Sequence, residues 1–202
     1  SCNTAFVEMS EQIGADELRK YAKAFGVGEN YDLGVSTSGG TLGDLPDGAA
    51  TAQSAIGQRD VTMTALQAAV MAGTVANKGT RMQPYLVNRI TDAQMKDVRT
   101  TKPKKADQAV NEETAATLTD LMYASERSSW GYDGNGFASK TGTAEHGEGL
   151  APHVWYVAFD PERDIAVGVV VKNGGNLGES ATGGKVSGPI GRAILRAYQG
   201  EQ

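Results

Sequence analysis

The spacing of apolar residues divides the chain into a helical part followed by a sheet. Apolar residues recur at helical spacing in five segments, 4–13, 16–25, 65–78, 112–126 and 185–199. Runs of β-branched and aromatic residues predict four strands, at 84–90, 137–143, 153–160 and 165–172. This order predicts an α+β fold, mainly helical over about 1–130 and closed by an antiparallel sheet and a terminal helix over about 131–202.

Local signals mark the ends of several predicted helices. Gly14 separates the first two, and Thr64 with Gln67 fits a capping box at the start of the third. Asn111 is a predicted N-cap for the fourth. Segment 29–60 is a long polar loop, and loops of that length in a compact domain are often functional.

Two other polar segments are predicted to lie outside the hydrophobic core. Residues 92–105 are polar and basic and predict an excursion from the domain, and 173–184 form a glycine-rich loop. The predicted apolar face of the last helix, by contrast, consists of Ile190, Ala193, Ile194 and Ala197.

Composition and charge narrow the class of protein. Hydrophobic residues make up 40% of the 202 residues and charged residues 21%, which is typical of one globular domain. A formal charge of −5 argues against nucleic acid as a main partner. Cys2 is the only cysteine, which excludes an internal disulfide. The two histidines, His146 and His153, lack metal-ligand spacing, so no metal or cofactor is predicted.

An unusual polar stretch, Lys140-Thr141-Gly142-Thr143, lies on the second predicted strand. Glycine allows another backbone or a ligand to approach closely, lysine supplies a positive charge and threonine supplies hydroxyl hydrogen bonds. These residues suit one edge of a carboxylate-binding cleft. They equally suit an exposed edge strand that a lysine protects from pairing.

A second polar stretch, Ser1-Cys2-Asn3, directly precedes the first predicted helix. Serine and asparagine are good N-cap residues, and taken alone this structural interpretation is the stronger one. Cys2 is more typical of a small packed thiol than of a catalytic one.

Taken together, the two stretches resemble conserved motifs of the penicillin-binding proteins and serine β-lactamases. Ser1-Cys2-Asn3 resembles the second motif of that family, at the head of a helix, and Lys140-Thr141-Gly142 resembles the third, on the strand that lines the cleft. Segments 57–67, 72–79 and 84–87 are similar to class B transpeptidases. The Ser-Cys-Asn-Thr-Ala-Phe, Lys-Thr-Gly-Thr-Ala-Glu-His and Ala-Thr-Gly-Gly strings resemble the actinobacterial penicillin-binding protein A group, and the resemblance extends over essentially the whole chain.

This resemblance implies a peptidoglycan D,D-transpeptidase that cross-links D-Ala-D-Ala stem peptides through a serine acyl-enzyme, and that β-lactams acylate. It implies that Ser1 relays a proton to the leaving amine and that Asn3 hydrogen-bonds the substrate peptide. Lys140 would polarise the Ser1 hydroxyl and attract the terminal carboxylate. Thr141 and Thr143 would supply hydroxyls to that carboxylate, and the Thr143 N–H an oxyanion contact.

The first motif of the family, the nucleophile Ser-x-x-Lys, does not occur in this sequence: no serine has a lysine three residues later. We therefore expect this chain to be the C-terminal part of a transpeptidase domain and to be inactive alone. The resemblance further implies an upstream segment of the same protein as a partner, possible partners in cell division and cell-wall synthesis, and an upstream anchor at the extracytoplasmic face of the plasma membrane.

Two alternatives use the same fold. One is a non-catalytic β-lactam sensor or cell-wall binding module, and the other is a D,D-carboxypeptidase, in which water replaces the acceptor amine. The resemblance also implies that the strand at 165–172 is central in the complete sheet of the family, so that it would form an open edge here. His146 follows the cleft strand, either as a substrate contact or as an ordinary loop residue, whereas His153 begins the next strand.

Overall fold

The computed structural model describes residues 2–200, and its elements follow the predicted order. The helices are α1 (Asn3–Ala24), α2 (Gly48–Ala55), α3 (Ala65–Ala76), α4 (Glu112–Arg127), the 3-10 helix η1 (Lys172–Ser180) and α5 (Ser187–Gly200). The strands are β1 (Thr80–Met82), β2 (Arg89–Thr91), β3 (Asp97–Thr100), β4 (Lys105–Gln108), β5 (Ala138–Ala144), β6 (His153–Asp160) and β7 (Ile165–Val171).

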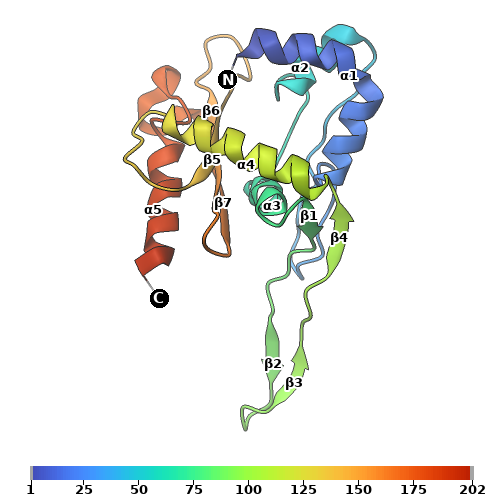
Figure 1. Ribbon diagram of the computed structural model, residues 1–202, viewed down its shortest axis with the longest axis vertical. Coiled ribbons are helices and arrows are strands. Elements are labelled where there is room, and N and C mark those ends of the chain that lie inside the picture. The colour runs from blue at the N-terminus through green and yellow to red at the C-terminus, as the bar shows by residue number, and fades with distance from the viewer. Residues whose placement is uncertain (1, 201–202) are drawn as a thin grey trace.

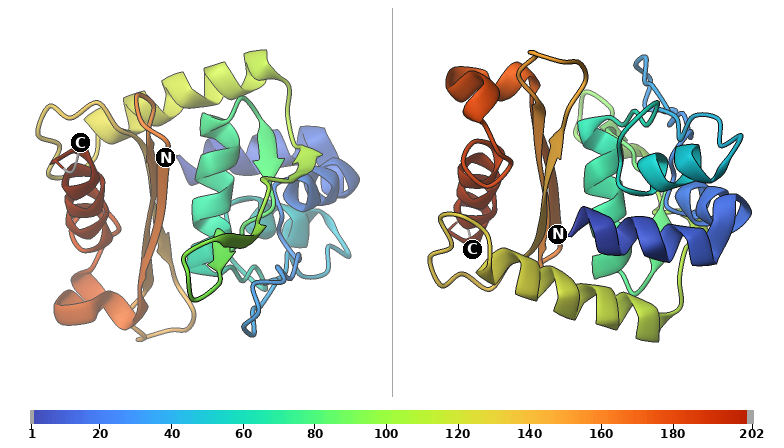
Figure 2. Two further views of the ribbon diagram at one scale, coloured as in Figure 1. Left: turned by 90° about the horizontal axis from the view of Figure 1, so that it is seen from below. Right: turned by 90° about the horizontal axis from the view of Figure 1, so that it is seen from above.

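The main sheet has three antiparallel strands in the order β5-β6-β7. Helix α5 covers one face of this sheet, and α3 covers the other, with α1 and α2 beyond it (Figure 2). Helix α4 contacts β5, the strand that follows it in the chain. The predicted α+β fold with an antiparallel sheet is thus confirmed.

A separate hydrophobic core lies on each face of the sheet. The core beneath α5 is formed by Phe137, Tyr156, Ala158, Val167 and Leu195. The core beneath α3 is formed by Ala72, Val75, Ala138 and Phe159, with Leu118 and Met122 of α4 packed against it. The two cores hold the sheet from both sides and therefore fix the position of β5.

Local sequence signals proved reliable at helix ends. Gly14 has a left-handed backbone (φ 73°) and interrupts α1 where the break was predicted. Thr64 and Gln67 form the predicted capping box on α3, and the Asn111 side chain accepts a hydrogen bond from the Thr114 N–H.

The prediction of a strand at 84–90 was wrong. Pro84 has no N–H to donate, and pairing occurs on either side of it: β1 pairs with β4, and β2 pairs with β3. The β2–β3 hairpin forms an arm that extends away from the body, as expected of an excursion (Figure 1). The loops at 29–60 and 173–184 were predicted without helices, but they contain α2 and most of η1.

The predicted apolar face of the last helix was also wrong. Ile190 and Ile194 are each about half exposed. Instead α5 buries Gly188, Gly191 and Leu195 against the sheet. At Gly191 a Cβ atom would clash with the ring of Tyr156, so the helix packs closely through its small residues rather than through its isoleucines.

Candidate functional site

Strand β5 presents different residues to the two faces of the sheet. Lys140 pairs with Val157, which pairs in turn with Gly168 of β7. Gly168 packs against the backbone of α3, so Lys140 and Gly142 lie on the α3 face of the sheet. Ser139, Thr141 and Thr143 alternate with them and lie on the α5 face.

The Lys140 side chain lies at an exposed position, and its Nζ donates to the Thr141 carbonyl at 2.6 Å. Nearby protein atoms displace part of the water around the ammonium group, and this desolvation lowers the pKa of Lys140 from its ordinary value. No carboxylate of residues 2–200 forms an ion pair with Lys140, and a lysine with a lowered pKa in such a setting is suited to interaction with an incoming anion.

Gly183 allows close contact between the turn that precedes α5 and the backbone of β5 at Gly142. At Gly183 a Cβ atom would lie 2.7 Å from the Gly142 carbonyl oxygen and 3.0 Å from its nitrogen, so only glycine fits at Gly183. The Gly183 N–H also points to the Thr143 hydroxyl at 3.5 Å. The position of the Thr143 side chain therefore depends on this turn.

The outer edge of β5 carries no neighbouring strand among residues 2–200. Backbone groups of alternate residues face the same edge of a strand. Two donors from the chain itself occupy carbonyls on this side: Lys140 contacts the Thr141 carbonyl, and the Gln58 amide donates to the Thr143 carbonyl at 3.3 Å. The edge is thus a row of accessible backbone groups with a cation at its centre.

The predicted site residue Ser1 lies outside the described residues. Asn3 is the first residue of α1 and is exposed, and the first turn of α1 lies beside the sheet in Figures 1 and 2. Cys2 occupies the N-cap position without a side-chain capping bond, so Asn3 is not the cap. Within residues 2–200, no hydrogen bond of the Asn3 side chain is recorded, and the amide is accessible to a ligand.

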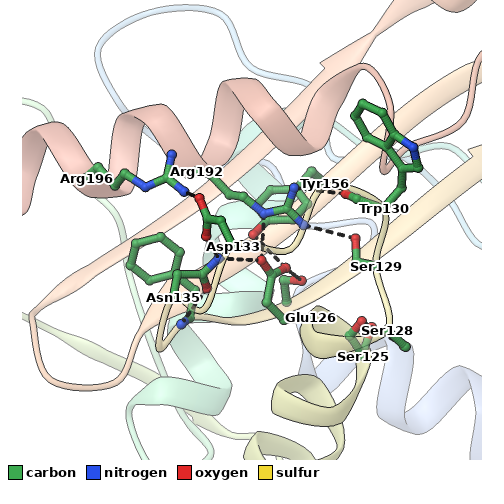
Figure 3. A network of polar contacts seen from close by, with 12 residues as sticks. Ser125, Glu126, Ser128, Ser129, Trp130, Asp133, Asn135, Tyr156, Arg192 and Arg196 are labelled. Atoms are coloured by element: carbon green, nitrogen blue, oxygen red, sulfur yellow. Dashed lines mark hydrogen bonds and ion pairs between the residues drawn. The ribbon is translucent and has the colours of Figure 1, made fainter.

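A buried polar network supports β5 from the α5 side (Figure 3). Glu126, at the end of α4, is 0% exposed, and Arg192 of α5 is 2% exposed. Their Nε–Oε1 distance is 2.6 Å. Glu126 also accepts hydrogen bonds from the Ser139 hydroxyl, the Tyr156 hydroxyl at 3.0 Å and the Asn135 amide at 2.9 Å. The network therefore joins α4, β5, β6 and α5.

Electrostatics keep this buried pair ionised. Burial alone would raise the pKa of Glu126, but the hydrogen bonds from Arg192, Ser139 and Asn135 outweigh it and hold that pKa below its usual value. Burial and the nearby Glu126 carboxylate raise the pKa of Tyr156, which remains a neutral donor. Because Ser139 directly precedes Lys140, the network fixes the start of the motif strand.

The two histidines lie together beyond the end of β5. Their ring centroids are 4.0 Å apart. His146 Nε2 lies 2.9 Å from the Ala151 carbonyl, and His153 Nδ1 accepts a hydrogen bond from the Asn173 N–H at 3.1 Å. His153 begins β6 as predicted, and a substrate role for His146 stays a prediction.

Three contributors to this site were not assigned a role from the sequence. Gln58 and Gly183 belong to sequence segments that resemble the family, but only the folded structure shows that they contact β5. Glu126 carried no signal of burial, because a charged residue at the end of a helix is normally exposed.

No helix among residues 2–200 is long and apolar enough to cross a membrane.

Comparisons with known proteins agree with the motifs. The family model of the penicillin binding protein transpeptidase domain matches residues 1–196. The peptidoglycan D,D-transpeptidase PbpA of Mycolicibacterium smegmatis is 45% identical over 206 residues, covering 98% of this chain and 42% of that protein. The chain thus spans less than half the length of this relative.

Solved structures agree with the fold. The ceftriaxone acyl-enzyme of penicillin-binding protein A from Mycobacterium tuberculosis is 41% identical and matches with a TM-score of 0.91, over 97% of this chain and 46% of that one. Its penicillin G acyl-enzyme is 42% identical and matches with a TM-score of 0.90, over 98% and 46%.

These similarities extend along nearly the whole chain, and they confirm the expected transpeptidase-like fold and the resemblance to the actinobacterial penicillin-binding protein A group. The chain belongs to the penicillin-binding protein transpeptidase family.

Proposed function

We propose that this chain is the C-terminal part of the transpeptidase domain of a peptidoglycan D,D-transpeptidase, a serine acyl-transfer enzyme that β-lactams acylate. The observation that carries the proposal is the arrangement of Lys140, Thr141 and Thr143 along an accessible edge of β5, in a chain of this family. Within the domain, residues 1–130 would form the helical region, and residues 131–202 the sheet and terminal helix.

The proposed roles follow from the chemistry of each group. Lys140 would attract the terminal carboxylate of a D-Ala-D-Ala peptide and polarise the Ser1 hydroxyl, which would pass a proton to the leaving D-alanine. Asn3 would hydrogen-bond the peptide, and the Thr141 and Thr143 hydroxyls would bind the carboxylate. Gly142 would keep the strand free of side-chain bulk where the substrate lies.

Strand geometry supports the oxyanion role proposed for Thr143. Its carbonyl accepts a hydrogen bond from a side chain outside the sheet, so its N–H faces the same open edge. A single oxyanion donor is worth about 3–4 kcal/mol of transition-state stabilisation. The serine nucleophile would come from a Ser-x-x-Lys motif that precedes Ser1.

The complete protein would act at the extracytoplasmic face of the plasma membrane, held by an anchor that precedes this chain. Its partners would be peptidoglycan stem peptides, β-lactams, the preceding segment and other proteins of cell-wall synthesis and cell division.

Acylation of the full-length gene product tests the proposal. We expect one equivalent of a fluorescent penicillin to remain bound after denaturation, at a serine that precedes residue 1. Absence of label would support a binding module, and label within residues 1–202 would show that the nucleophile is misassigned. Incubation with a D-Ala-D-Ala donor and an amine acceptor should give the cross-linked product, whereas only hydrolysed donor would identify a carboxypeptidase.

A further inference from the structure

Gln58 contacts the edge of β5 from a distant part of the chain. Its Nε2 donates to the Thr143 carbonyl at 3.3 Å, across 85 residues of sequence. The side chain is half-buried and the contact lies at the surface, so an incoming molecule has access to it. Gln58 is thus a neutral donor that covers a backbone acceptor on the open edge.

The loop that carries Gln58 is held in an unusual conformation. Gly57 (φ 77°) and Arg59 (φ 61°) both have left-handed backbones, which a non-glycine residue such as Arg59 rarely adopts. Contacts hold the loop in place: Arg59 donates to the Asp44 carbonyl, and the Gln58 N–H donates to the Gln53 carbonyl at 3.0 Å. Such backbone conformations cluster at functional sites, where the surrounding structure maintains them.

A ligand that lies along β5 would need the acceptor that Gln58 occupies. An extended peptide binds to an open strand edge by donating its own N–H groups to the outward carbonyls. The amide N–H of an acyl donor is such a group. A hydrogen bond from the ligand to Thr143 would replace the one from Gln58.

We propose that Gln58 is a specificity-determining residue that caps the Thr143 carbonyl in the free protein and is displaced by acyl donors with an amide N–H. While it is bound, Gln58 also protects the edge from pairing with another chain. Donors that lack the N–H gain nothing from displacing it. This inference rests on the proposed acyl-transfer function and adds to it a group that competes with the donor N–H and so reduces the preference for donors that carry one.

A matched pair of ligands and variants of the full-length gene product test the inference. The ligands are benzylpenicillin and its analogue methylated on the side-chain amide nitrogen, which lacks only the N–H donor. The variant Gln58→Met keeps the length of the side chain and removes its donor. Gln53→Met is the control, because Gln53 lies on the neighbouring helix α2, is exposed and makes no recorded side-chain hydrogen bond among residues 2–200.

The measured quantity is the ratio of the second-order acylation rate constants for benzylpenicillin and its N-methyl analogue. We expect Gln58→Met to raise this ratio about two- to tenfold, the range that one neutral hydrogen bond is worth, and Gln53→Met to leave it unchanged. If Gln58→Met fails to fold, Gln58→Ala should raise the ratio equally.

Other outcomes separate the two proposals. A ratio that stays within 1.5-fold of wild type, or falls, would overturn the role of Gln58 while leaving the proposed function in place. Equal acceleration with both ligands would mean that Gln58 only blocks the cleft by its bulk, which also overturns the inference. Failure of the wild-type protein to form an adduct with either ligand would overturn the proposed function and this inference together.

Discussion

The two outer strands of the sheet, β5 and β7, are built for different tasks. Strand β7 (Ile165–Val171) is apolar apart from Gly168, and it is packed between α3 and α5. Strand β5 carries serine, lysine and threonine, and its open edge contacts the Lys140 ammonium and the Gln58 amide. One side of the sheet is used for packing, and the other side presents hydrogen-bonding groups to a ligand.

The difference also appears in how each strand is held. Apolar contacts hold β7, and its outer edge, like that of β5, pairs with no strand among residues 2–200. Buried polar contacts of Glu126 with Ser139 hold the start of β5. Polar contacts have narrower geometric limits than apolar ones, so they suit a strand whose side chains must be positioned for chemistry.

The largest effect should come from removing the support of β5. Glu126→Ala would leave the buried Arg192 charge without its carboxylate partner, which costs about 3–5 kcal/mol of unfolding free energy. Urea denaturation of the full-length gene product measures this cost, and amide exchange should show a greater loss of protection in β5 than in β7. Glu113→Ala, at an exposed position on the same helix, should cost less than about 1 kcal/mol. Equal costs for the two variants would contradict the structural role of the network.

A nearly equal effect, on rate rather than stability, is expected at Lys140. Lys140→Ala should slow penicillin acylation about a hundredfold, because one transition-state charge contact is worth about 3 kcal/mol, and the exposed side chain adds little to packing. The matched variant Lys172→Ala, just after β7, should keep the wild-type rate. An acylation rate of Lys140→Ala within threefold of wild type would remove this lysine from the mechanism.

Glycine substitutions compare the two strands directly. At Gly168 of β7 a Cβ atom would clash with the Ala65 carbonyl and lie 2.7 Å from the Ala69 nitrogen, both in the α3 backbone. Gly168→Ala should therefore cost about 1–3 kcal/mol of stability. At Gly142 of β5 the nearest atom would be Trp155 Cβ at 3.2 Å, so Gly142→Ala should be milder. Thermal melting of both variants checks the order, and the reverse order would contradict the packing of β7 on α3.

The smallest expected effect is the contribution of His153 to the pH dependence of stability. His153 lies between the ends of the outer strands. Burial, then His146 and Lys172, lower the pKa of His153 below 6.5. Between that lowered pKa and 6.5 the unfolded chain binds more protons, so stability should rise with pH across this window. His153→Gln should flatten the rise in melting temperature between pH 5 and 7, and an unchanged slope would show that His153 does not titrate in this range.

Local patterns predicted most of the fold, and distant contacts explain what they missed. Strand β6 lies where its β-branched and aromatic residues predicted, and the Thr64 capping box needs only neighbouring residues. The burial of Glu126 depends on Arg192, which is 66 residues away. The Gln58 contact likewise depends on the fold. The apolar face of α5 was misassigned because a strip of glycines packs closer to the sheet than isoleucines can.

For the candidate site, too, local sequence identified some features, and contacts between distant residues determined the others. Family resemblance identified Asn3 and Lys140-Thr141-Gly142-Thr143 from residue types and order, and their proposed roles stay predictions. The resemblance implied an oxyanion role for the Thr143 N–H, but residue types alone could not show which edge of β5 is open, because that depends on its pairing with β6.

The arm formed by the β2–β3 hairpin makes the molecule electrically asymmetric. Residues 85–104 contain five basic and two acidic residues, which gives the arm a formal charge of +3 and leaves −8 on the rest of the chain. Because the arm projects from the body, these opposite charges are separated in space and form a molecular dipole (Figure 1). Near a negatively charged polymer or surface, the chain would turn with its arm foremost. Salt would weaken this orientation over distances beyond about 8 Å at physiological ionic strength.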